Sequence, residues 1–152
     1  MSLGKPPRLA EVFQKYDPPV YFVTLCTNDR RKTLANAAVC SAVIEYGRRG
    51  LERGFVLSRY VIIPDYIHLF ITGADDFNSG VWVRGLKRVV AAAVSGGRVG
   101  LWQPGFLDHL IRSGESYSEK WNYVRDNPVR AGLTSHAEEW AYQGEIVWID
   151  RA

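Results

Sequence analysis

A chain of 152 residues, with 47% hydrophobic and 23% charged residues, is long enough for one domain with a hydrophobic core, and this composition excludes a disordered chain. The formal charge of +3, from 19 Lys and Arg against 16 Asp and Glu, is a small excess that does not by itself indicate a nucleic-acid partner. The sequence has no run of 18 apolar residues and no apolar signal core near its start, so it predicts neither membrane insertion nor secretion. We therefore expect one cytoplasmic domain over residues 1–152.

The first half of the chain predicts one strand, one helix and then two further strands. Residues 20–27 are rich in β-branched and aromatic residues, which is typical of a strand. Apolar residues recur at helical spacing between residues 33 and 53, and Gly54 ends that pattern. Two strand-like runs follow at residues 55–63 and 66–72, and the short Pro-Asp break between them predicts an antiparallel pair.

The second half predicts two helices separated by a short strand. Apolar residues at helical spacing place one helix around residues 82–93, and residues 106–112 have the character of a short strand. A Ser-x-x-Glu capping pattern that begins at Ser116, together with a proline at the far end, bounds the next helix at residues 117–127. The tail has strand character at residues 145–149.

The order of these elements predicts the fold class. Helices are interleaved with strands that pair as hairpins, and the chain has no repeat and no clear internal linker. This order is typical of α+β proteins, in which helices pack on an antiparallel sheet in the manner of a split β-α-β fold. It does not fit a parallel, doubly wound sheet.

The strand at residues 66–72 carries a candidate metal ligand. Because side chains alternate along a strand, Tyr66 and His68 point to one face and Asp65 points to the other. A neutral imidazole is a good ligand for a transition metal and an acceptable one for Mg²⁺ or Mn²⁺, whereas a phenol must first lose its proton. The alternative interpretation of His68 is a hydrogen-bonded, half-buried strand histidine.

The helix at residues 117–127 carries a candidate nucleophile. Tyr123 and Asn127 are four residues apart, which places them on one helix face. A tyrosine hydroxyl attacks phosphorus when another group positions the phosphate and neutralises its charge, and a cation held partly by Asn127 would do both. The alternative is that Tyr123 packs the helix on the sheet and that Asn127 only ends the helix.

Basic and aromatic residues provide candidate nucleic-acid contacts. Arg84, Lys87 and Arg88 cluster at helical spacing, and Arg125 and Arg130 flank the candidate nucleophile helix. A solvated helix face is the more common explanation for each cluster taken singly.

Aromatic side chains are the other candidates, because they can stack on unpaired bases. Most of the tryptophans are better explained as core residues, since aromatic side chains bury large areas. The candidates for stacking are Trp82, Trp102, Trp121 and Tyr66.

Four segments of the chain resemble those of a known family. The segments are YFVTLCTNDRRKTL at residues 21–34, VIIPDYIHLFI at 61–71, LWQPGFLDHLIRSGESY at 101–117 and YVRDNPVRAGL at 123–133. The last two of these segments are the most specific. On these segments the chain is similar to the single-tyrosine transposases of the HUH type, and specifically to the branch associated with repetitive extragenic palindromes (REP).

This resemblance implies a fold, a reaction and a set of site residues. The implied fold is a single transposase-like domain with a ferredoxin-like antiparallel sheet, and the implied assembly is a homodimer. The implied reaction is cleavage of single-stranded or hairpin DNA, with Mg²⁺ or Mn²⁺, through a 5′-phosphotyrosine. Tyr123 falls on the nucleophile, His68 on the second histidine of the metal pair, and Asn127 on the third metal ligand. Tyr66 departs from the family, since it stands where the family has its first histidine.

Three functional hypotheses follow. The first is a transposase-related enzyme that nicks and rejoins single-stranded or hairpin DNA through Tyr123. The second is a catalytically impaired DNA-binding protein of the same fold, because Tyr66 leaves only two protein ligands for a hard cation that already keeps much of its water. The third is a small interaction domain whose basic face meets an acidic partner, which only the charge of +3 supports.

Overall fold

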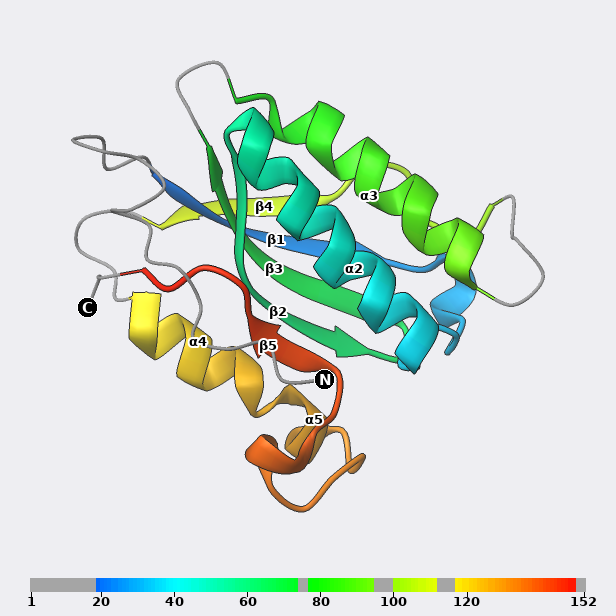
Figure 1. Ribbon diagram of the computed structural model, residues 1–152. Helices are drawn as coiled ribbons and strands as arrows, with labels where there is room; N and C mark the ends of the chain where they lie inside the picture. Colours follow the sequence, from blue (N-terminus) through cyan, green and yellow to red (C-terminus); the bar gives the residue numbers. More distant parts are fainter. Residues whose placement is uncertain (1–18, 74–76, 95–99, 112–116, 150–152) are drawn as a thin grey trace.

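Five antiparallel strands form one sheet in the computed structural model, which describes residues 19–73, 77–94, 100–111 and 117–149. The strand order is β4-β1-β3-β2-β5, so the strands of the β2–β3 hairpin are central neighbours (Figure 1). The strands are β1 (Val20–Cys26), β2 (Phe55–Ile63), β3 (Tyr66–Gly73), β4 (Leu107–Ile111) and β5 (Gln143–Glu145). The expected α+β fold, an antiparallel sheet with helices packed on it, is confirmed.

Seven helical segments accompany this sheet in the part of the chain that the structure describes. The α-helices are α2 (Ala37–Gly50), α3 (Ser79–Ala93), α4 (Tyr117–Arg125) and α5 (Asn127–Arg130). The short 3₁₀ turns are η1 (Asn28–Arg30), η2 (Leu51–Arg53) and η3 (Ala137–Glu139). Within the described residues, none of these helices has the length and apolar character needed to cross a bilayer.

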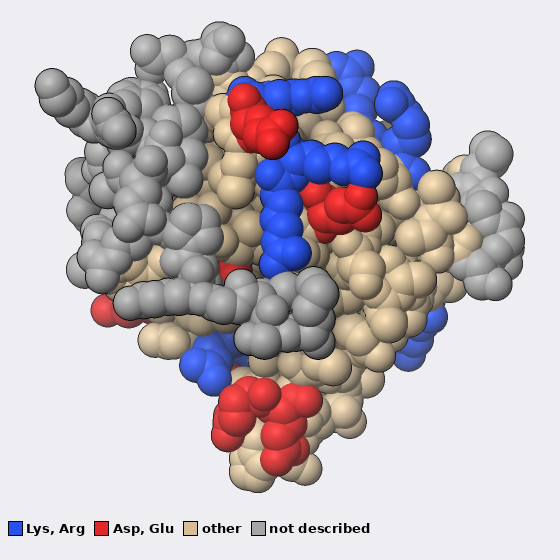
Figure 2. Space-filling view, viewed as in Figure 1, with Lys and Arg blue, Asp and Glu red and all other residues tan. Residues whose placement is uncertain are grey.

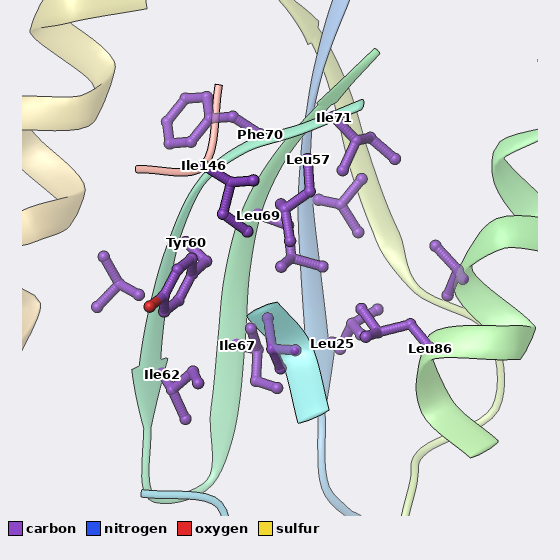
Figure 3. Close-up of a cluster of buried hydrophobic side chains, with 14 of the residues drawn as sticks. Leu25, Leu57, Tyr60, Ile62, Ile67, Leu69, Phe70, Ile71, Leu86 and Ile146 are labelled. Atoms are coloured by element: carbon purple, nitrogen blue, oxygen red, sulfur yellow. The ribbon is translucent and has the colours of Figure 1, made fainter. Parts of the chain in front are cut away.

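Helices α2 and α3 cover one face of the sheet and bury most of the core there (Figure 1). Leu86 of α3 reaches toward Leu25 of β1, beside the leucine and isoleucine side chains of β3 (Figure 3). The hydroxyl of Tyr46 in α2 donates to the Trp82 carbonyl in α3 at 2.8 Å, which ties the two helices together. We call this the α2/α3 face.

Helix α4 covers the opposite face, and Phe70 is the residue on which it packs. The Phe70 ring lies 5.0 Å from the Tyr117 ring and 6.1 Å from the Trp121 ring, centre to centre. The Tyr117 hydroxyl also shares a hydrogen bond of 2.8 Å with the buried hydroxyl of Ser58 in β2. Since Phe22 and His68 share this side of the sheet with Phe70, we call it the α4 face.

The boundaries of the first two helices differ from the sequence expectation at their polar ends. The helix expected from residue 33 begins only at Ala37, because the Asn36 side chain accepts a hydrogen bond from the Val39 backbone and caps it. Gly54 stops the following turn as predicted, with a φ of 79° that glycine adopts without strain. In α3 the buried stripe includes Val83 and Val90, in place of the expected Val89 and Ala93.

Two predictions for the C-terminal part were wrong in position. The helix at residues 117–127 begins as expected but ends at Arg125, and Asn127 starts α5, because a proline is well suited to the first turn of a helix. The last strand is Gln143–Glu145, where it pairs with β2, and not residues 145–149. The capping residue Ser116 lies outside the described residues.

Replacing Phe70 with alanine tests how α4 is held. We expect Phe70→Ala to lower the free energy of unfolding by about 3 to 5 kcal/mol, because the fully buried ring fills the space between β3 and α4. The control is Leu107→Ala on edge strand β4, whose side chain is 70% exposed and should matter by less than about 0.5 kcal/mol. Urea unfolding measures both, and equal effects would contradict this packing account.

Candidate functional site

Tyr66 and His68 lie next to each other on the α4 face, as the strand alternation predicted. Their ring centres are 4.9 Å apart in an edge-on arrangement. Cross-strand register sets them opposite Cys26 and Thr24 of β1. The β2–β3 hairpin therefore presents both side chains at the end of the sheet near its turn.

His68 is held as a neutral imidazole. Its Nδ1 shares a hydrogen bond of 2.8 Å with the Thr24 hydroxyl, which fixes the ring and leaves Nε2 as the other ring nitrogen. Burial lowers the pKa of His68 to about 4, and the positive charges of Lys120 and Arg130 act in the same direction. At neutral pH the imidazole therefore carries no charge. Thr24 could not be found from the sequence, because only cross-strand register brings it to His68.

Tyr123 and Asn127 are brought together by Arg130 and not by a shared helix face. The helix ends between them, so Tyr123 belongs to α4 and Asn127 to α5. The guanidinium of Arg130 lies 4.3 Å from the centre of the Tyr123 ring, donates to the Tyr123 carbonyl at 2.8 Å and also donates to Asn127 Oδ1. Tyr123 is 64% exposed, so it is accessible from solvent.

Positive charge converges on His68 from the covering helices. Lys120 of α4 lies with its ammonium 4.7 Å from the Phe22 ring centre, and Phe22 contacts His68. Arg130 affects both His68 and Tyr66 electrostatically. Sequence reasoning missed Lys120, although its position one turn before Tyr123 on the same helix was a usable signal.

The expected Mg²⁺ or Mn²⁺ site can be tested against these donors. Burial, together with the charge of Asp65, raises the pKa of Tyr66 above its usual value, so the phenol stays protonated and is a poor ligand. Asn127 Oδ1 already accepts from Arg130, and two cations act on His68. Across the described ranges, no cluster of three or more His, Cys, Asp or Glu residues is placed to hold a metal. The residues therefore do not fit the three-ligand cation site that the resemblance implies.

The five basic residues proposed for DNA binding divide between the two faces of the sheet. Arg84 and Arg88 are exposed on α3, on the α2/α3 face, where basic side chains gather with acidic ones among them (Figure 2). Lys87 is engaged within the protein, donating to the Gln103 carbonyl at 3.0 Å and to the Gly105 carbonyl. On the other side, Arg125 lies 4.0 Å from Glu138, and Arg130 forms the cluster described above. Their roles toward DNA stay predictions.

The tryptophans proposed for base stacking pack within the protein. Trp82 is 1% exposed, and Trp102 donates its indole N–H to the Lys87 carbonyl at 3.0 Å. Trp121 lies under the guanidinium of Arg59, 5.0 Å from its ring centre, and helps fix α4 to the sheet. Tyr66, Trp102 and Trp121 are all partly exposed, and Tyr66 is the one of them that lies next to His68.

The depressed pKa of His68 predicts a pH dependence of stability. Between pH 6.5 and about 4 the unfolded chain binds a proton at His68 that the folded protein does not, so this contribution is present above pH 6.5 and is lost as the pH falls toward 4. The loss is on the order of 3 kcal/mol. His68→Gln, which cannot titrate there, should lose less stability than the wild type between pH 7 and pH 4.5 in urea unfolding. Equal losses would show that His68 titrates normally.

Comparisons with known proteins bear on the family and the fold of this chain. No protein-family model matches the chain. A REP-associated tyrosine transposase of Escherichia coli K12 is 30% identical over 128 residues, which cover 80% of this chain and 73% of that protein. A solved structure of a REP-associated tyrosine transposase bound to a REP hairpin is 27% identical, with a TM-score of 0.67 over 86% of this chain and 80% of that one.

A more distant structure shows the fold alone. It is a protein of Deinococcus radiodurans R1, 18% identical, with a TM-score of 0.51 over 75% of this chain and 94% of that chain. The family assignment rests on the identity and coverage of the Escherichia coli relative, and not on the fold alone. On that sequence match, this chain belongs to the REP-associated tyrosine transposases.

Proposed function

We propose that this protein binds single-stranded or hairpin DNA through the surface formed by α4 and α5. The observation that carries the proposal is the cluster in which Arg130 holds Tyr123 and Asn127 at the surface, with Lys120 on the same side. Lys and Arg side chains bind phosphates by charge, and exposed aromatic rings stack on unpaired bases. The solved relative bound to a REP hairpin supports DNA as the partner class.

Binding without cleavage is the function that the donor set supports best. The charge on phosphate oxygens is neutralised here by side chains, Lys120 and Arg130, and Tyr66 supplies a neutral phenol where the family has a histidine. Arg84 and Arg88 form a second basic surface on the α2/α3 face, whose contact with DNA is a separate expectation. The homodimer implied by the resemblance stays a prediction, which the molar mass in light scattering checks.

A second candidate function is DNA nicking, favoured by the exposure of Tyr123. In this reaction the phenol oxygen attacks phosphorus, the phenol proton is lost, and the bond from phosphorus to the 3′ oxygen breaks. The 3′ oxygen takes up a proton, and the 5′ phosphate remains on Tyr123 as a phosphotyrosine. Arg130, beside the Tyr123 ring, is placed to stabilise charge on the phosphate.

The DNA-binding proposal predicts a preference and a salt dependence. We expect tighter binding of a hairpin with a single-stranded tail than of perfect duplex, with affinity falling steeply as salt rises. Arg125→Gln should lower the slope of log affinity against log salt by about 1, because one phosphate contact is lost. The control is Arg49→Gln on α2, which removes an equal charge from the α2/α3 face and should leave the slope unchanged. Equal affinity for duplex and hairpin would contradict the proposal.

The nicking candidate predicts a specific mutant phenotype. If a covalent adduct forms on a labelled hairpin oligonucleotide, Tyr123→Phe should abolish it and leave hairpin affinity within about twofold, because only the hydroxyl is removed. The reaction is assayed on denaturing gels with Mg²⁺, with Mn²⁺ and with EDTA. Retention of the adduct in Tyr123→Phe would assign the nucleophile elsewhere, with Tyr66 as the next candidate.

A further inference from the structure

We propose that a groove beside Tyr66 binds one unpaired nucleotide of the DNA strand, an inference that rests on the proposed DNA binding. The groove has a volume of about 530 Å³, within the usual range for a small-molecule site. We call it the Tyr66 groove. Among its lining residues are Arg30, Lys32, Ile63, Pro64, Tyr66 and Leu133.

The lining offers the two kinds of surface that a nucleotide needs. Ile63, Pro64 and Leu133 provide an apolar wall, and Tyr66 adds an aromatic ring that is still partly exposed. Arg30 and Lys32 are both exposed cations in the same lining. Single-stranded nucleic acids are bound by this combination, in which bases stack on aromatic rings and cations follow the phosphates.

The cation Arg30 is held in place by an unusual loop. Asp29 and Arg30 have φ values of 54° and 52°, in the left-handed region that non-glycine residues seldom adopt. The side chain of Asn28 anchors the loop by donating to the carbonyls of Gly100 and Trp102, both at 2.8 Å. The Arg30 side chain lies 3.5 Å from the carboxylate of Asp65, which also lines the groove. Such strain persists only where the surroundings enforce it, which is common at ligand sites.

The Tyr66 groove is continuous with the surface proposed to bind DNA. Ala131 and Leu133, which follow α5 directly, form part of its wall. Ala131 directly follows Arg130, which contacts the Tyr123 ring, so the Tyr123 cluster lies beside the groove. A strand with one phosphate at Arg130 can therefore place an adjoining unpaired base against Tyr66.

The aromatic side chain of Tyr66 suits a nucleotide better than a cation. The partly exposed Tyr66 ring lines the groove, where an unpaired base can stack on it. Part of the negative charge of Asp65 is offset by Arg30. The position that the family gives to a metal-binding histidine is therefore, in this chain, a position for base stacking.

The test compares Tyr66 variants on hairpins with and without a single-stranded tail. We expect Tyr66→Ala to weaken binding of the tailed hairpin about 5- to 100-fold, the equivalent of one lost base stack, and to change binding of the tailless hairpin less than twofold. Tyr66→Phe should retain affinity. Tyr66→Leu keeps the apolar packing and should lose affinity like alanine, which separates stacking from a folding defect. Tyr21→Ala on the α2/α3 face is the matched tyrosine control.

Abasic substitution along the tail identifies the base. One tail position should weaken wild-type binding by the same factor as Tyr66→Ala and have no added effect in that variant, because coupled partners are not additive. Lys32→Gln should lower the salt slope by about 1 for the tailed hairpin only. A flat abasic scan, or equal losses on tailed and tailless hairpins, would overturn the proposal.

The outcomes also separate this inference from the proposed function. The free tail oligonucleotide is titrated alone, so the groove is tested even where the hairpin stem contributes nothing. If the protein binds the tailless hairpin and the abasic scan is flat, the groove proposal is wrong and the proposed DNA-binding surface stands. Absence of binding to hairpin and to tail alike overturns both.

Discussion

The packing of α4 on Phe70 is the interaction on which the candidate site depends. That ring contacts Tyr117 and Trp121, and Arg59 lies 5.2 Å and 5.0 Å from the centres of the same two rings. Arg59 in turn pairs with Glu145 of β5 at 2.9 Å, so strands β2, β3 and β5 all help to fix the helix. Because α4 carries Lys120 and Tyr123, the position of this helix determines where both side chains lie relative to His68. A shift of α4 would therefore move Lys120 and Tyr123 together relative to His68.

Electrostatics links the tyrosine at position 66, where the family has a histidine, to the kind of ligand that the site can bind. A divalent cation needs anionic or carbonyl oxygen ligands and neutral imidazoles, with few positive charges nearby. Here Tyr66 is a protonated phenol, and Lys120 and Arg130 act on His68. The same charges that disfavour a cation favour a phosphate. We therefore propose that this site prefers an anionic ligand, a DNA phosphate, to a divalent cation.

The sequence allowed the strand pairing and the relation of Tyr66 to His68 to be predicted, because strand alternation is a local property. The break between Tyr123 and Asn127 was not predicted, since a proline both ends one helix and starts another well. Thr24 and the Tyr66 groove depend on contacts between segments far apart in the chain, which local patterns do not contain. The family resemblance indicated which residues to consider, but the contacts of Arg130 with Tyr123 and Asn127 could be found only from the three-dimensional arrangement.

The central claim is that side-chain cations, and not a bound metal, hold the DNA phosphates at this site. The most direct measurement is the affinity of the wild-type protein for a tailed hairpin at constant ionic strength, in EDTA, Mg²⁺ and Mn²⁺. We expect the three dissociation constants to agree within about twofold, with Arg130→Gln weakening binding equally in all three, because lost charge assistance does not depend on the metal. Binding that strengthens tenfold or more with Mn²⁺ over EDTA would contradict this account and restore a metal site at His68 and Asn127.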